Sequence, residues 1–269
     1  MLFLSALVIN LAYMKSARRY SSDPVLSFFL FFCLMYMDTN NGLRQMVAAA
    51  IVILAFPLLE KRRYFLFALF VAAAYQLHNT AAIWVLIAIA VVGKPMNIRT
   101  KFALLLGLVF LLVPGLVTGF LDSVTVDNQY NSYLDLKGGM RIARALVSGI
   151  IPGALAVIFY YKSKRNGVVL DRSDSMMLNI VIINTMFVLM GTYMQYWNRF
   201  AFYTMFSTYI MIPKLAEGVF GEYSFYRGGI RMGMTILYFL YFCYNIYANS
   251  GLPGASSDSL HNFYIEWWC

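Results

Sequence analysis

Long apolar runs recur from one end of the chain to the other, separated by short polar or basic gaps. Several runs reach or approach the roughly 20 residues that a helix needs to cross about 30 Å of hydrocarbon. The pattern predicts an all-α polytopic membrane protein with about 9–10 transmembrane or re-entrant helices. The runs cover residues 1–14, 25–37, 44–59, 65–77, 79–92, 102–121, 142–161, 176–195, 199–212 and 230–248.

The two runs between residues 65 and 92 flank the polar residues His78, Asn79 and Thr80. If the chain turns back there, each arm has about 13–14 residues and is about 20 Å long, which is short of a full span. We therefore expect a re-entrant or thinned hairpin that lines a protein-walled or watery cavity. One long tilted helix is the alternative.

Composition agrees with this interpretation. The chain is 61% hydrophobic and 12% charged, about half the charged fraction of a soluble domain. No stretch between the runs is long enough for a separate soluble domain, so we expect one integral membrane domain over residues 1–269. The three cysteines lie far apart, and no nucleotide-binding loop, metal-ligand spacing or serine-hydrolase motif is present.

The net charge of +9 is explained by basic residues in short inner loops, not by nucleic-acid binding. Sixteen of the 21 basic residues fall in alternate gaps, which we assign to the cytoplasmic face. The polar segment 122–140 and the aromatic tail 249–269 are then expected outside. Five basic residues are left on the outer side: Arg44, Lys137, Arg141, Arg144 and Arg199.

The first candidate constellation consists of Asn41, Arg44 and Gln45. It lies where a helix is expected to begin at the outer boundary of the membrane. A helix N-terminus favours an anion, and an arginine adds a two-pronged donor suited to phosphate. The alternative is an arginine that extends its guanidinium to the lipid headgroups.

His78 is the second candidate, because it lies inside an apolar stretch beside polar neighbours. A histidine exchanges protons near neutral pH and can act as a general base for a sugar hydroxyl. The alternative is a histidine that is hydrogen-bonded between helices.

Two more constellations lie on the same expected side. Arg141 and Arg144 share a helix face, where an anion such as a diphosphate would relieve their repulsion. Tyr196 and Trp197 could stack on a sugar ring, with Arg199 beside them. The alternatives are headgroup-binding arginines and an aromatic belt at the membrane boundary.

Several short motifs occur in an order that resembles a known family. They are N-x-x-R-Q-x-x-A (Asn41, Arg44, Gln45, Ala48), K-R-R-Y-F (Lys61 to Phe65), H-x-T (His78, Thr80) and R-x-x-x-Y before I-P (Arg199, Tyr203, Ile212, Pro213). From about residue 20 to 245 the chain resembles the EpsG family of exopolysaccharide and capsule polymerases, relatives of the Wzy O-antigen polymerases. That family usually carries further N-terminal helices with an R…G-x-D-x-x-Y element, which this chain is expected to lack.

The resemblance implies a bacterial inner-membrane, multi-pass glycosyltransferase with a fold similar to the GT-C type. Its members join undecaprenyl-diphosphate-linked oligosaccharide repeat units on the outer face. The lipid diphosphate is the leaving group, so no cofactor, metal, nucleotide sugar or ATP is expected. The lipid bilayer, a flippase and a chain-length regulator are the partners that the resemblance implies, and nucleic acid is not among them.

Three functions remain open from the sequence. In a polymerase, Arg44 would be catalytic with His78 as general base, and the substrate would contact Asn41, Gln45, Arg141, Arg144, Tyr196, Trp197 and Arg199. A flippase for the same lipid-linked unit would instead place arginines along a path through the membrane. A membrane O-acyltransferase would need its histidine on a path from the cytoplasm.

Overall fold

Every described element of the chain is a helix. The computed structural model describes residues 2–113, 142–193, 196–221 and 226–248, so the predicted outer loop 122–140 and tail 249–269 lie outside the described residues. The elements are α1 (Leu2–Tyr20), α2 (Pro24–Asn41), α3 (Leu43–Glu60), α4 (Tyr64–Leu77), the 3-10 turn η1 (Asn79–Ala82), α5 (Ile83–Val91), α6 (Ile98–Leu112), α9 (Ile142–Ala145), the π-helical turn η2 (Leu146–Ile150), α10 (Ile151–Arg165), α11 (Arg172–Tyr193), α12 (Tyr196–Phe220) and α13 (Tyr226–Ala248).

The predicted all-helical fold is confirmed, although several helices are longer than their apolar runs. α1 continues to Tyr20 and α12 starts at Tyr196. Apolar runs mark the part of a helix that packs or faces hydrocarbon, and charged and aromatic residues extend the same helix at its ends.

Leu43–Glu60, Ile142–Arg165 and Arg172–Thr192 are long and apolar enough to cross a membrane, and shorter apolar helices accompany them. Large hydrophobic side chains also cover the surface, as on α13, where Leu240 is 61% exposed. Such an exposed apolar surface is typical of a protein embedded in lipid.

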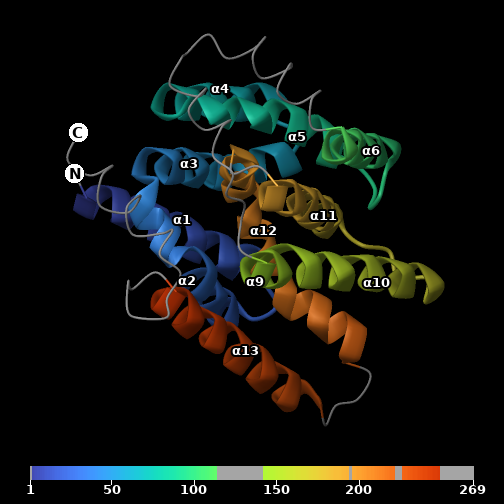
Figure 1. Cartoon of the computed structure of the whole chain (residues 1–269). Helices are drawn as coiled ribbons and strands as arrows, with labels where there is room; N and C mark the ends of the chain where they lie inside the picture. Colours follow the sequence, from blue (N-terminus) through green and yellow to red (C-terminus); the bar gives the residue numbers. More distant parts are fainter. Residues whose placement is uncertain (1, 114–141, 194–195, 222–225, 249–269) are drawn as a thin grey trace.

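α11 and α12 form the centre of the bundle. They pack along each other, and α12 also contacts α2, α10 and α13 while α11 contacts α5 and α6. In Figure 1, α4, α5 and α6 lie along one side of this pair and α13 lies along the opposite side. α11 is 78% buried over its apolar window, so its polar side chains face other helices.

The chain turns back at His78, as the hairpin interpretation predicts. α4 ends at Leu77, and His78 has an extended backbone before η1 and α5 begin. The far ends of both arms meet the first half of α11: Arg172 donates to the Tyr64 hydroxyl at 3.4 Å, and Asn179 donates to the Val91 carbonyl at 3.0 Å. The alternative of one long tilted helix is therefore wrong.

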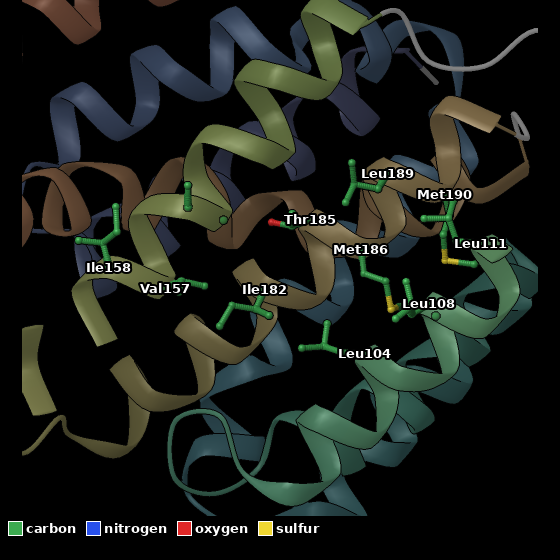
Figure 2. Close-up of a pocket in the computed structure, with 13 residues that line it drawn as sticks. Leu104, Leu108, Leu111, Val157, Ile158, Ile182, Thr185, Met186, Leu189 and Met190 are labelled. Carbon is green, nitrogen blue, oxygen red and sulfur yellow. The ribbon is translucent and has the colours of Figure 1, made fainter. Parts of the chain in front are cut away.

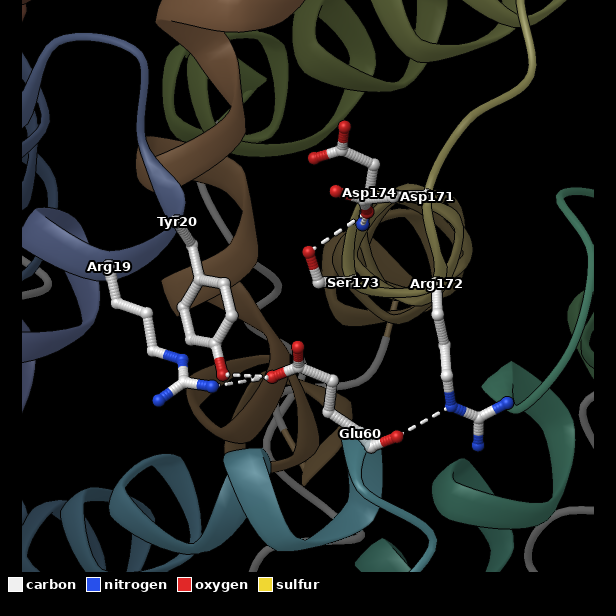
Figure 3. A network of polar contacts seen from close by, with 7 residues as sticks. All are labelled: Arg19, Tyr20, Glu60, Asp171, Arg172, Ser173 and Asp174. Atoms are coloured by element: carbon white, nitrogen blue, oxygen red, sulfur yellow. Dashed lines mark hydrogen bonds and ion pairs between the residues drawn. The ribbon is translucent and has the colours of Figure 1, made fainter.

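A polar network closes one end of the bundle, which we call the Glu60 end (Figure 3). The Glu60 carboxylate accepts hydrogen bonds from Arg19 at 3.1 Å and from the Tyr20 hydroxyl at 2.9 Å. Arg172 Nε donates to the Glu60 carbonyl at 2.6 Å. These contacts join α1, α3 and α11 where three of the predicted inner loops lie. The opposite end, where α3 and α12 begin, is called the Arg44 end.

The turn η2 interrupts the helix that follows Arg144. A π turn breaks the regular ladder and leaves carbonyl groups to be satisfied by other donors. The Val147 carbonyl accepts from Tyr238 at 2.9 Å, the Ser148 carbonyl from Asn184 at 2.9 Å, and the Gly149 carbonyl from Thr185 at 3.0 Å. Side chains of α11 and α13 therefore hold this turn in place.

Candidate active site

Three helical segments start close together at the Arg44 end: α3 at Leu43, η1 at Asn79 and α12 at Tyr196. Two side-chain contacts tie them to one another. Gln45 Nε2 donates a 2.6 Å hydrogen bond to the carbonyl of Arg199, and Thr80 Oγ1 donates to the Tyr203 hydroxyl at 3.2 Å. Residues far apart in the sequence thus meet at the Arg44 end.

Arg44, His78 and Arg199 come together at this junction, and we call them the Arg44 cluster. The Arg44 side chain is exposed, and it has no acidic partner among the residues that the structure describes. Arg199 and His78 are half-buried. The positive charges of Arg199 and Arg44 both act on the imidazole of His78. The cluster is therefore a concentration of positive charge beside a titratable ring.

His78 lies between α4 and η1, outside both helices. Its pKa is lowered from 6.5 to about 4, first by burial and then by the positive charges of Arg199 and Arg44. At neutral pH the imidazole is therefore uncharged and holds a lone pair on one ring nitrogen.

The hydrogen bonds of His78 identify which nitrogen that is. His78 Nδ1 lies 2.6 Å from Thr80 Oγ1, and the Thr80 hydroxyl proton is directed to Tyr203. Thr80 Oγ1 must then accept, so Nδ1 carries the proton and donates it to Thr80. This leaves Nε2 as the basic nitrogen.

Peptide dipoles add to the charge of the arginines. Neither Gly42, before α3, nor His78, before η1, caps the following helical turn with its side chain. The amide groups of a first turn carry partial positive charge and bind anions when no side chain occupies them. The first turn of α3 and two guanidinium groups at one place favour a ligand with several negative charges, such as a diphosphate.

Arg144 lies near the cluster but has a different contact. Its two terminal nitrogens bind both carboxylate oxygens of Asp38, and the Arg144 Nη1 to Asp38 Oδ1 distance is 2.9 Å. The Asp38 side chain is only 17% exposed and that of Arg144 only 20%. Asp38 thus neutralises an arginine that was predicted to bind substrate, and the pair joins α2 to α9.

Trp197 is buried, contrary to its predicted place on a sugar-binding surface. Its ring lies 5.5 Å from that of Phe200 and 6.1 Å from that of Phe110, and it stacks on Phe187 at 6.2 Å. Only 8% of the residue is exposed. The indole therefore packs the start of α12 against α6 and α11, and its faces are occupied by protein.

The side chains of three other predicted residues are not described. Arg141 lies outside the described residues, and the side chains of Asn41 and Tyr196 are not described. Sequence reasoning missed Asp38 and Asn184. Asp38 carried a signal, because an acidic residue at the end of an apolar helix is rare without a partner or a function. Asn184 looked like one more polar residue in an apolar helix.

No curated protein and no solved structure matches the chain. The model of the EpsG family matches residues 1–260, which is nearly the whole chain. The chain therefore belongs to the EpsG family.

Proposed function

We propose that this protein is a glycosyltransferase that polymerises polyprenyl-diphosphate-linked oligosaccharide repeat units on the outer face of a bacterial inner membrane. Membership of the EpsG family supports a role in exopolysaccharide synthesis. The Arg44 cluster, with a neutral histidine beside two arginines and the uncapped start of α3, is the observation that carries the proposal.

The reaction makes one bond and breaks one. A hydroxyl oxygen of the acceptor saccharide attacks the anomeric carbon of the donor, and the bond from that carbon to the diphosphate breaks. The lipid diphosphate leaves with the electron pair, and Arg44 and Arg199 stabilise its growing charge. His78 Nε2 accepts the proton of the attacking hydroxyl.

The lowered pKa of His78 fits this order of events. Without substrate, burial and then the charges of the two arginines keep the imidazole neutral. A bound diphosphate offsets their charge, so it raises the pKa of His78 and makes Nε2 a better proton acceptor. Substrate binding would thereby prepare the base.

The test is the size distribution of lipid-linked saccharide in a deletion strain complemented with wild type, Arg44→Ala, Arg44→Lys or Arg18→Ala. Arg18 is an exposed arginine in the last turn of α1 and serves as the control. We expect single repeat units on the outer face and no long polymer with either Arg44 variant, because lysine cannot make a two-pronged contact. Arg18→Ala should yield polymer of normal length.

Other outcomes would contradict the proposal. Single units that remain on the inner face in the deletion strain would indicate a flippase. Polymer of normal length that lacks acyl groups would indicate an O-acyltransferase. Polymer of normal length from Arg44→Lys would exclude the two-pronged contact.

A further inference from the structure

An apolar groove runs between α6, α10 and α11, outside the Arg44 cluster (Figure 2). Its volume is about 520 Å³, within the roughly 300–1,000 Å³ that is usual for small-molecule sites. Its three walls are formed by α6, α10 and α11, with side chains such as Leu108, Val157 and Met186. The groove is thus large enough for part of a ligand.

The side chains that line the groove are suited to a hydrocarbon ligand and offer no free polar group to a polar one. Thr185 is its one polar side chain, and the hydroxyl of Thr185 is hydrogen-bonded to the carbonyls of Gly149 and Val181 at 3.0 Å each. Apolar cavities of this kind exclude water. Methionines among the walls adapt to branched or irregular shapes.

Close helix packing forms the floor of the groove. A side chain at Gly107 would collide with Met186, and one at Gly153 would collide with Thr185. α6 and α10 can therefore approach α11 closely at these points. Exposed side chains such as Leu108 and Ile158, each 49% exposed, leave the groove open to the surrounding lipid.

The groove ends beside the Arg44 cluster. It follows α11 from Ile182 to Met190, about 12 Å along the helix axis. The next residue, Gly191, packs directly against Asn198, the neighbour of Arg199. On the other wall, Leu111 follows Phe110, whose ring contacts Trp197 at the start of α12. A chain that lies in the groove would have its head near Arg199.

We infer that this groove holds the polyprenyl tail of the lipid-linked donor while the Arg44 cluster holds its diphosphate. The inference rests on the proposed function. It adds a second, apolar contact to the same substrate, so that lipid-linked saccharide is selected by both its charge and its tail. The α6–α10–α11 groove would then align the donor for attack.

Photo-crosslinking locates the tail directly. A photoreactive amino acid replaces Leu108 in the groove or, as the control, Leu240 on the exposed face of α13. The full-length protein is placed in nanodiscs of phosphatidylethanolamine and phosphatidylglycerol with undecaprenyl diphosphate, and the products are identified by mass spectrometry. We expect adducts of undecaprenyl diphosphate at position 108 and of phospholipid at position 240. Adducts at position 108 with phospholipid, or with residues 114–141 of the chain itself, would overturn the inference.

Binding measurements separate the tail from the head. Ala154 lines the groove and is exposed, so Ala154→Trp fills the groove without a collision in the core. Ala68→Trp on the exposed face of α4 is the matched control. Ala154→Trp should weaken undecaprenyl diphosphate binding by about tenfold or more, because buried CH₂ groups are lost. Binding of inorganic diphosphate should be unchanged, and Ala68→Trp should alter neither.

The two probes distinguish the two proposals. If inorganic diphosphate binds and Ala154→Trp leaves undecaprenyl diphosphate binding intact, the groove inference is wrong and the proposed function stands. If neither probe binds the wild-type protein, the Arg44 cluster is not a diphosphate site and both proposals fall.

Discussion

Asp38 and Arg144 form a two-pronged ion pair across 106 positions of sequence, between the end of α2 and the start of the helix that contains η2. Gly42, one turn after Asp38, donates its amide to the Asp38 carbonyl at 3.1 Å and precedes Arg44. The guanidinium of Arg144 also lies over the ring of Phe202, at 5.6 Å. The pair therefore fixes the turn that presents Arg44 relative to α9 and α12.

Breaking this pair should destabilise the protein more than exchanging its two members. Asp38→Asn or Arg144→Ala leaves one group without its partner in a poorly solvated place, and we expect a loss of about 3 kcal/mol in the free energy of unfolding. The reciprocal double variant, Asp38→Arg with Arg144→Asp, should recover much of it. Thermal unfolding in detergent measures the effect.

The ion pair of Arg231 with Asp23 is the control, because Arg231 is 56% exposed and the two atoms are 2.9 Å apart. Arg231→Ala should cost less than about 1 kcal/mol. If the double variant folds but yields no polymer, Arg144 has a role in the reaction beyond its contact with Asp38.

The hydrogen bond from Gln45 to the Arg199 carbonyl should matter for both stability and ligand binding. Gln45 is 3% exposed, so Gln45→Met keeps the volume but removes the donor. We expect a loss of about 1 kcal/mol in the free energy of unfolding and weaker binding of inorganic diphosphate, measured by calorimetry. Asn10→Ala removes an exposed, local hydrogen bond and should change neither quantity.

His78 should make stability depend on pH. Its pKa is about 4 in the folded chain and about 6.5 when unfolded, so the unfolded chain binds more protons in between. The contribution of His78 to the free energy of unfolding is therefore fully present above about pH 6.5 and is lost as the pH drops toward 4. The fall in unfolding temperature between pH 7.5 and pH 5 should be smaller in His78→Gln than in wild type. An equal fall in His78→Gln and wild type would contradict the lowered pKa of His78.

Close packing of α10 on α11 predicts opposite effects for two glycines. A Cβ at Gly153 would collide with Thr185, whereas a Cβ at Gly233 in α13 would meet nothing within 4 Å. Gly153→Ala should therefore lower the free energy of unfolding by about 1–3 kcal/mol. Gly233→Ala should raise it by up to about 1 kcal/mol, because alanine favours a helix. Thermal unfolding of both variants checks the contrast, and an equal sign for the two would refute it.

The sequence was sufficient for the helices and for part of the site. Apolar runs locate helices because burial in the bundle and exposure to lipid both require apolar side chains. The polar break at His78 marked the turn of the hairpin. The alternation of basic gaps placed Arg44 and Arg199 on the same expected side, and in the structure Gln45, the neighbour of Arg44, donates to the Arg199 carbonyl. These features depend on local composition and on the order of elements.

The contact partners of individual side chains could not be predicted from the sequence in the same way. Arg144 looked like a second anion ligand because nothing local reveals that Asp38 lies opposite it. Trp197 looked like a surface residue because aromatic belts and aromatic cores have the same composition. The donors that satisfy η2 come from α11 and α13, so neither the turn nor the role of Asn184 follows from its own segment.

The uncapped start of α3 has a consequence for how the proposed anion site can evolve. Its partial positive charge comes from peptide groups, which do not titrate and which side-chain substitutions leave in place. If the Arg44 cluster binds a diphosphate, as proposed, the surrounding residues can change one after another while the amide groups of α3 still favour the anion. Diversification of the surrounding surface toward new saccharides would then not require the site to be rebuilt each time.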